Sequence, residues 1–260
     1  MDERPLAPPF DRYARQVAMG ARPDWYAARR FAMQRRVGRE IRSGTRRADV
    51  VLFGDSMMEY WTRAGHGRET CGTGFGTRSI ANFGTGGDTF LNAIWRMAHG
   101  LFDGFAPNAV VMCVGGADVG ETGIERPAMA AKRIGILTTL LREVMPATPV
   151  LACGIFYRRT EPEYVAFTAE VNRLLEAACG GTLTFVPPFL TPSDAGDTRY
   201  FWDGIHFTRH AYEQWGRALR PLLDRVAPAA PNSVPTIAPS VFEDEAIRRI
   251  HSLRKALRLG

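Results

Sequence analysis

Short apolar runs alternate with amphipathic stretches between Asp49 and about Val226. Five runs are apolar, brief and bounded by polar or glycine-rich segments, which predicts strands. These runs are residues 50–53, 79–83, 109–114, 150–155 and 183–186. Their near-continuous apolar character is typical of parallel strands that are covered on both faces.

Apolar residues recur with helical spacing between these runs. The clearest sets are Leu91, Ile94, Trp95 and Ala98; Ile134, Leu137, Leu141 and Val144; Tyr164, Phe167, Val171, Leu174 and Ala178; and Ala211, Tyr212, Trp215, Leu219 and Leu222. Alternating strands and helices predict β-α-β units with right-handed crossovers. The expected fold class is therefore α/β, a three-layer α/β/α sandwich formed by residues 49–226.

Two flanks fall outside the alternating pattern. Residues 1–48 are rich in Arg and Ala and predict an N-terminal helical arm that packs on the sandwich. Residues 227–240 predict a Pro-rich linker, and residues 241–260 predict an amphipathic helix whose acidic first turn suits the helix dipole. A homo-oligomer that forms through these terminal helices is left open.

Composition narrows the function classes. The 260 residues are 45% hydrophobic, enough for one sizeable core, and no apolar run is long enough to cross a membrane. The net charge of +6 would suit nucleic acid. However, Lys132 and Lys255 are the only lysines, and the many arginines form no recognisable nucleic-acid-binding module, so we expect no nucleic-acid partner.

The four cysteines are widely spaced and lack the pairing typical of zinc sites. No phosphate-binding loop of the Walker type is present, and we expect neither a metal nor a cofactor. Cys113 and Cys153 lie in apolar runs, where a buried, reduced thiol is the simplest interpretation. Together with an N-terminus that lacks the apolar stretch of a secretory signal, this predicts a cytoplasmic protein.

Ser56 is the first candidate for chemistry. The apolar run at 50–53 leads into Gly54-Asp55-Ser56, and a helix-like stretch follows. In open α/β sheets, ligands bind beyond the carboxyl ends of the strands, and a helix N-terminus there favours developing negative charge. The alternative is that Ser56 only caps the helix.

A serine hydroxyl needs an adjacent base to act as a nucleophile. Of the five histidines, His206 is the best placed to be that base. It follows the last predicted strand and immediately precedes the final helix. Asp203, three residues earlier, is close enough in a tight loop to orient the imidazole. Taken alone, this short pattern also fits an ordinary polar surface loop.

A glycine-rich loop, Asn82-Phe83-Gly84-Thr85-Gly86-Gly87-Asp88, follows the second predicted strand. Its glycines would let the backbone approach a ligand closely, although a plain tight turn explains them too. Asp88 is expected to cap the next helix.

The order of these pieces resembles the SGNH (GDSL) hydrolase family, in particular the catalytic subunits of platelet-activating-factor acetylhydrolase. Four blocks within residues 49–225 carry the resemblance: Phe53 to Ser56; Asn82 to Asp88, continuing into Trp95-Arg96-Met97; Pro107 to Asp118; and Asp203 to His206. The resemblance implies a flavodoxin-like, five-stranded parallel sheet in the order 2-1-3-4-5. It also implies Ser56, His206 and Asp203 as a catalytic triad.

The same resemblance implies an oxyanion hole formed by the N–H groups of Ser56 and Gly87 and by an asparagine side chain. This chain has Ala117 in the asparagine's place, and alanine offers no side-chain donor. Asp55, Asn82 and Trp202 are the expected substrate-binding residues. Candidates to replace the missing donor are Asn82, Thr85, Asn92 and Arg158.

The expected function is a serine esterase that removes a short, acetyl-like group from a carbohydrate or another small ester. One alternative is an O-acyltransferase, because an acyl-enzyme accepts water or an alcohol alike. Another is a catalytically impaired binding protein, to which Ala117 lends weight.

Overall fold

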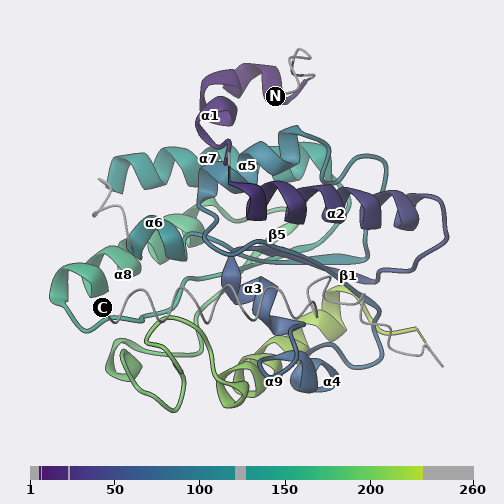
Figure 1. Ribbon diagram of the computed structural model, residues 1–260. Helices are drawn as coiled ribbons and strands as arrows, with labels where there is room; N and C mark the ends of the chain where they lie inside the picture. The colour runs from purple at the N-terminus through teal and green to yellow at the C-terminus, as the bar shows by residue number, and fades with distance from the viewer. Residues whose placement is uncertain (1–5, 7, 23, 121–126, 231–260) are drawn as a thin grey trace.

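A five-stranded parallel sheet forms the centre of the protein (Figure 1). The computed structural model describes residues 6, 8–22, 24–120 and 127–230. The strands are β1 (Val50–Gly54), β2 (Ile80–Gly84), β3 (Ala109–Cys113), β4 (Val150–Cys153) and β5 (Leu183–Val186). Their order is β2-β1-β3-β4-β5, which confirms the predicted topology.

Helices cover both faces of the sheet. One face carries α5 (Phe90–Ala98), α7 (Pro127–Val144) and α8 (Pro162–Ala178), and the other carries α3 (Ser56–Trp61), α4 (Cys71–Phe75) and α9 (Arg209–Val226). The short α6 (Gly116–Gly120) follows β3, and three 3-10 helices, Phe10–Tyr13, Arg68–Thr70 and Pro192–Asp194, lie in connections. The result is the expected three-layer α/β/α sandwich. Pro221 lies inside α9, and the helix continues through it.

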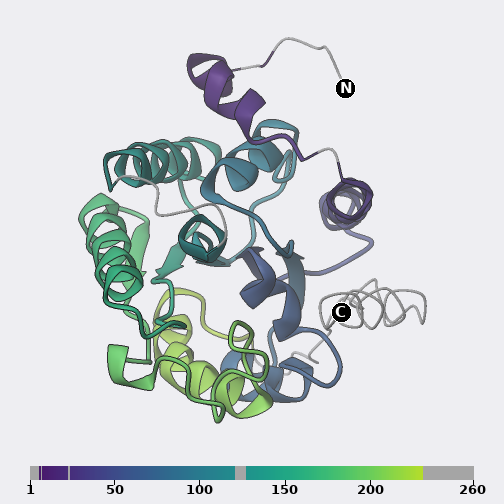
Figure 2. The same cartoon turned by 60° about the vertical axis from the view of Figure 1, so that its left-hand side comes forward.

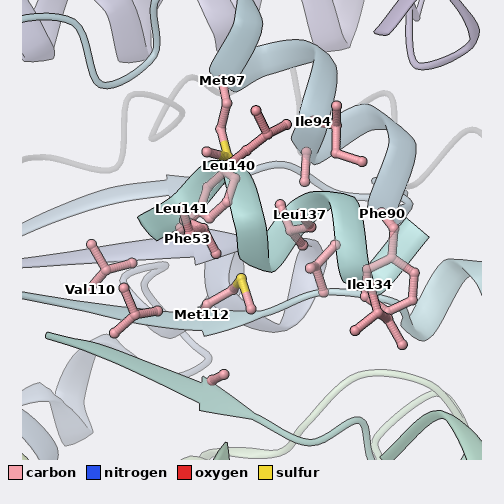
Figure 3. Packing of buried hydrophobic residues seen from close by; sticks show 14 of the residues in the cluster. Phe53, Phe90, Ile94, Met97, Val110, Met112, Ile134, Leu137, Leu140 and Leu141 are labelled. Carbon is pink, nitrogen blue, oxygen red and sulfur yellow. The ribbon is translucent and has the colours of Figure 1, made fainter. Parts of the chain in front are cut away.

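The two layers have separate hydrophobic cores because each strand directs alternate side chains to opposite faces. On the first face, Phe53 and Met112 of the sheet pack under Phe90 of α5 and Leu137 of α7 (Figure 3). The second core is aromatic: Trp61 stacks on Trp215 with ring centroids 4.3 Å apart. Both cores fix the strand ends from which the candidate site residues emerge.

The N-terminal arm consists of α1 (Ala14–Met19) and the longer α2 (Trp25–Arg42). The first helix packs against α5, and the second lies beside the end of β2 (Figures 1 and 2). Asp24 begins α2 by accepting a hydrogen bond from the backbone N–H of Ala27 (2.9 Å). The arm thus packs on the sandwich at the edge strand.

Most of the expected C-terminal linker, and all of the helix expected at 241–260, lie outside the described residues. Within the ranges that the structure covers, none of the helices combines the length and apolar character required to cross a bilayer.

Two glycines allow α4 and α9 to pack with their backbones in contact. A Cβ on Gly216 would lie 3.0 Å from both the Cα and the nitrogen of Gly74. By contrast, a Cβ on Gly135 of α7 would meet no atom within 4 Å.

We therefore expect Gly216→Val to lower the free energy of unfolding by about 1–3 kcal/mol, because the added methyl groups force the two helices apart. Gly135→Val is the matched control and should change it by about 0.5 kcal/mol or less. Urea denaturation of both variants measures the difference. Equal effects at the two positions would contradict the close packing of α4 on α9.

Candidate active site

Ser56 is the first residue of α3, directly after the carboxyl end of β1. The helix cap is Asp55, whose carboxylate accepts a hydrogen bond from the backbone N–H of Met57 (2.9 Å). The Ser56 hydroxyl is therefore not needed as a cap. Its Oγ lies 3.1 Å from Nε2 of His206.

Asp203 orients His206 from the other side of the imidazole. Oδ2 of Asp203 lies 2.7 Å from Nδ1 of His206, and Oδ1 accepts the backbone N–H groups of Ile205 (2.9 Å) and His206 (2.7 Å). Partial burial disfavours the charge of Asp203, but these hydrogen bonds and the imidazole outweigh it and lower the pKa of Asp203 to about 2. The carboxylate therefore stays ionised, and the structure brings together the three residues that the sequence singled out.

Gly87 lies at the exposed tip of the glycine-rich loop, with a φ of 78° that favours glycine. The loop lies close to the serine: a Cβ on Gly86 would be 3.7 Å from Cβ of Ser56. In the described part of the chain, the backbone N–H groups of Ser56 and Gly87 donate to no protein acceptor. Both are available to a ligand oxygen, whereas Ala117, in the first turn of α6, contributes only a methyl group.

A buried carboxylate holds the loop in place. Oε2 of Glu59 accepts the backbone N–H of Gly86 (2.6 Å), and Oε1 accepts the hydroxyl of Tyr26. Because Glu59 belongs to α3, these contacts link the serine-bearing helix to the glycine-rich loop and to α2. The same contacts limit how far Gly87 can move relative to Ser56.

An ion pair between Asp88 and Arg96 lies beneath this loop. Nε of Arg96 is 2.7 Å from Oδ2 of Asp88, and the two side chains are 4% and 1% exposed. Burial raises the pKa of Asp88 and lowers that of Arg96. The attraction between the two side chains opposes both of these shifts. The guanidinium also donates to the carbonyl oxygens of Phe83 (2.6 Å) and Gly54 (3.0 Å).

Three residues of the N-terminal arm contact the same loop. Arg22 donates to the carbonyl of Gly86 (2.7 Å) and to Asp88 (2.9 Å). Arg30 and Gln34 both donate to the carbonyl of Gly84. Sequence reasoning placed the arm on the sandwich but assigned these side chains no role. For Arg30 and Gln34 the available signal was their helical spacing from Val37, which puts all three on the buried face of α2.

Two of the expected substrate-binding residues are engaged within the protein instead. Asp55 is 3% exposed and accepts the N–H groups of Met57 and Gly116. Asn82 donates from its amide to the carbonyls of Met58 (2.6 Å) and Glu59 (3.2 Å), which ties β2 to α3. Both side chains are therefore occupied by hydrogen bonds within the protein. Asp88 also departs from expectation, since the cap of α5 is Thr89, which forms a capping box with Asn92.

Trp202 does lie beside the catalytic candidates. Its ring stacks near His206 with centroids 6.1 Å apart, and the residue is 49% exposed. Tyr60 and His66 complete an aromatic cluster, with Tyr60 4.7 Å from the His206 ring and His66 5.7 Å from Trp202. Burial and the nearby charges of Arg63 and His206 lower the pKa of His66 to about 4, so its ring is neutral at pH 7.

The described ranges contain no group of three or more His, Cys, Asp or Glu side chains arranged to hold a metal ion. What the site offers is a serine hydroxyl beside an oriented imidazole, two backbone donors and an aromatic surface. This arrangement suits nucleophilic attack on a carbonyl.

Known proteins share both the sequence pattern and the fold. Residues 52–214 match the model of the GDSL-like Lipase/Acylhydrolase family. Platelet-activating factor acetylhydrolase IB subunit alpha1 of Homo sapiens is 28% identical over 184 residues, which make up 68% of this chain and 76% of that protein.

Two solved structures illustrate the likeness in fold. A carbohydrate acetylesterase from Sinorhizobium meliloti has a TM-score of 0.51 at 16% identity, over 69% of this chain and 99% of the other. The inhibitor-bound aryl esterase of M. smegmatis has a TM-score of 0.52 at 18% identity, over 69% and 100%.

The buried Asp55 generates a pH-dependent prediction. Burial outweighs its hydrogen bonds and the charge of Arg158 and raises the pKa of Asp55 from 3.8 to about 6. The folded protein therefore holds this proton more tightly than the unfolded chain does. That stabilisation is complete below about pH 4 and is lost as the pH rises through about 6.

Asp55→Asn removes this titration. We expect the free energy of unfolding of the variant, minus that of the wild type, to rise by about 3 kcal/mol at most between pH 4 and pH 7. Urea denaturation across this range measures it, and most other titrating groups cancel in the difference. A difference that stays flat with pH would contradict the raised pKa of Asp55.

Proposed function

Since the chain belongs to the GDSL-like lipase/acylhydrolase family, and so to the carboxylic ester hydrolases, we propose that Ser56 is the nucleophile of an esterase that removes short acyl groups. The observation that carries the proposal is the 3.1 Å contact between Oγ of Ser56 and Nε2 of His206, with Asp203 2.7 Å from the opposite ring nitrogen. A histidine held in this way accepts the serine proton as the hydroxyl attacks.

In the first half of the proposed reaction, Oγ of Ser56 bonds to the acyl carbon and its proton passes to Nε2 of His206. The carbonyl oxygen becomes an oxyanion, which the N–H groups of Ser56 and Gly87 stabilise. Collapse of this intermediate breaks the ester bond. His206 gives its proton to the departing alcohol, leaving an acyl-enzyme.

In the second half, water replaces the alcohol. His206 accepts a proton from the water as its oxygen attacks the acyl carbon, and returns the proton to Oγ when the acid leaves. Asp203 holds the imidazole with Nε2 toward the serine and stabilises its charged form, because its own low pKa keeps it ionised throughout.

A short acyl group is favoured by what surrounds the serine. The glycine-rich loop beside Ser56 is backed by the charged or polar groups of Arg22, Tyr26 and Glu59. These groups are already hydrogen-bonded to one another and to the loop, so they offer a long alkyl chain no apolar surface, and moving them aside to admit one would break those hydrogen bonds. An acetyl group is short enough to leave these hydrogen bonds in place.

The leaving alcohol is expected on the opposite side, where His206 delivers its proton. Trp202, Tyr60 and His66 form the aromatic cluster there, with Trp202 49% exposed. Flat aromatic surfaces of this kind stack on apolar faces of rings, including those of sugars. A carbohydrate ester therefore suits both sides of the site, and the acetylesterase from Sinorhizobium meliloti shares this fold.

The first test is hydrolysis of p-nitrophenyl acetate, butyrate and octanoate by the wild type and by Ser56→Ala. We expect wild-type turnover to fall with chain length, and the variant to lose about 10³-fold or more of it. A fluorophosphonate should label the wild type and not Ser56→Ala.

Three other outcomes would redirect the proposal. Labelling without hydrolysis, but with ester formation when a sugar alcohol is added, would indicate acyl transfer. Absence of both labelling and turnover would indicate a binding protein that has lost catalysis. Octanoate as the preferred substrate would contradict a short acyl group.

The aromatic cluster has its own test. Trp202→Ala should raise KM for an acetylated monosaccharide by about tenfold, the value of one stacking contact. Vinyl acetate, whose leaving group offers no ring, is the internal control and should keep its KM. An equal change for both esters would argue that Trp202 supports His206 rather than the substrate.

A further inference from the structure

Four aromatic side chains contact one another in a closed cycle where the leaving alcohol is expected. Tyr60 contacts both histidines of the cycle, with its ring centroid 4.7 Å from that of His206 and 4.9 Å from that of His66. Trp202 also contacts both, at 6.1 Å from His206 and 5.7 Å from His66. His66 therefore belongs to the same surface as the proposed catalytic imidazole, although it lies far from His206 in the sequence.

The imidazole of His66 has hydrogen-bonding capacity that the protein does not use. The side chain is half-buried, in contact with Tyr60 and Trp202. Neither of its ring nitrogens has a hydrogen-bond partner among the residues that the structure describes, and neither is fully buried. By contrast, His99 is half-buried against another aromatic ring, and its Nδ1 lies 2.8 Å from the carbonyl oxygen of Trp95. Partial burial without a partner is unfavourable, so a ligand that supplies a partner for His66 is stabilised.

The His66 ring can both donate and accept a hydrogen bond. Burial and the charges of Arg63 and His206 lower the pKa of His66 to about 4. The charges of Asp203 and Glu69 oppose this shift but do not outweigh it. The ring is therefore neutral at pH 7, with one N–H donor and one acceptor nitrogen. A hydroxyl group matches this pair of functions, because it also donates and accepts.

The position of His66 limits which hydroxyl it can reach. Nε2 of His206 lies 3.1 Å from Oγ of Ser56, at the point where the departing oxygen receives its proton. Because the rings of His66 and His206 are 4.9 and 4.7 Å from Tyr60, they are at most about 10 Å apart, a gap that hydrogen bonds of about 2.9 Å to two neighbouring oxygens can span. A hydroxyl on a carbon next to the ester oxygen's own carbon is within this reach.

We propose that His66 binds a hydroxyl group of the leaving alcohol, beside the oxygen that carries the acyl group. This inference rests on the proposed function and narrows its substrates to esters of vicinal diols, the arrangement found in sugars and other polyols. Trp202 covers the apolar face of the alcohol's ring, and His66 forms a hydrogen bond at its edge. A simple alkyl ester fills the same space but leaves the imidazole without a partner.

The test compares two esters that differ by one hydroxyl group: the monoacetate of a vicinal trans-cyclohexanediol, and cyclohexyl acetate. His66→Phe keeps an aromatic ring against Tyr60 and Trp202 but removes both hydrogen-bonding nitrogens. We expect it to lower kcat/KM for the diol monoacetate by about 3–10-fold, the usual effect of losing one neutral hydrogen bond. The kcat/KM for cyclohexyl acetate should stay unchanged. Comparison of variant and wild type on the same ester cancels the intrinsic reactivity of that ester.

His66→Gln adds a second readout, because an amide also donates and accepts. It should recover about twofold or more of the loss that His66→Phe causes on the diol monoacetate, and change nothing on cyclohexyl acetate. His99→Phe is the matched control, since His99 also stacks on an aromatic ring, at the end of α5 on the opposite face of the sheet from α3. It should leave kcat/KM for both esters unchanged. Thermal unfolding of each variant checks that it is folded.

Three results would overturn the inference. The first is an equal loss on both esters, which would make His66 a support for Tyr60 and His206. The second is an unchanged kcat/KM on both esters, which would make His66 a solvated side chain. The third is a loss on the diol monoacetate that His66→Gln does not relieve, since hydrogen bonding would then not be its cause. In each case the wild type would still show Ser56-dependent turnover of p-nitrophenyl acetate and fluorophosphonate labelling, whereas the absence of both would overturn the proposed function itself.

Discussion

The buried ion pair between Asp88 and Arg96 is the contact on which the site depends. Arg96 donates to the last carbonyl of β1 and to a carbonyl of β2, and Asp88 is the last residue of the glycine-rich loop. One guanidinium thus ties together the strand that leads into Ser56 and the loop that carries Gly87. Both charges are removed from water, so each stabilises the fold only while the other is present. The ion pair therefore helps to fix the distance between Ser56 and Gly87, whose N–H groups are the proposed donors to a substrate carbonyl oxygen.

The N-terminal arm extends this network beyond the sandwich. Arg22 is a second cation that pairs with Asp88. Tyr26 donates to Glu59, which in turn accepts the backbone N–H of Gly86 in the loop. A helix that packs only by apolar contact tolerates small shifts, whereas these hydrogen bonds fix the arm to the loop in direction as well as distance. Residues far from the serine in sequence therefore help determine the shape of the site.

The surroundings of the serine and histidine differ in chemical character. The loop side is charged and held by many hydrogen bonds, which suits stabilisation of an oxyanion. The His206 side is aromatic, with Trp202 half exposed, which suits a departing alcohol that must enter and leave. The fold produces this division because β1 and β2 supply the first side, while the segment between β5 and α9 supplies the second.

Sequence patterns alone determined the five strands and singled out Ser56, Asp203 and His206, while the strand order followed from the resemblance to the SGNH family. Apolar runs such as 109–113 mark buried strands, and a Gly-Asp-Ser sequence and an Asp-x-x-His sequence at strand ends carry their chemistry locally. The same resemblance pointed to Ala117 as the position where a side-chain donor is missing. The sequence could not show that Asp55 and Asn82 point into the protein, because hydrogen-bond partners such as Gly116 and Met58 lie far away in the chain. Only the tertiary structure brought Arg22, Tyr26 and Glu59 to the loop, because no local sequence pattern identifies the distant hydrogen-bond partner of a polar side chain.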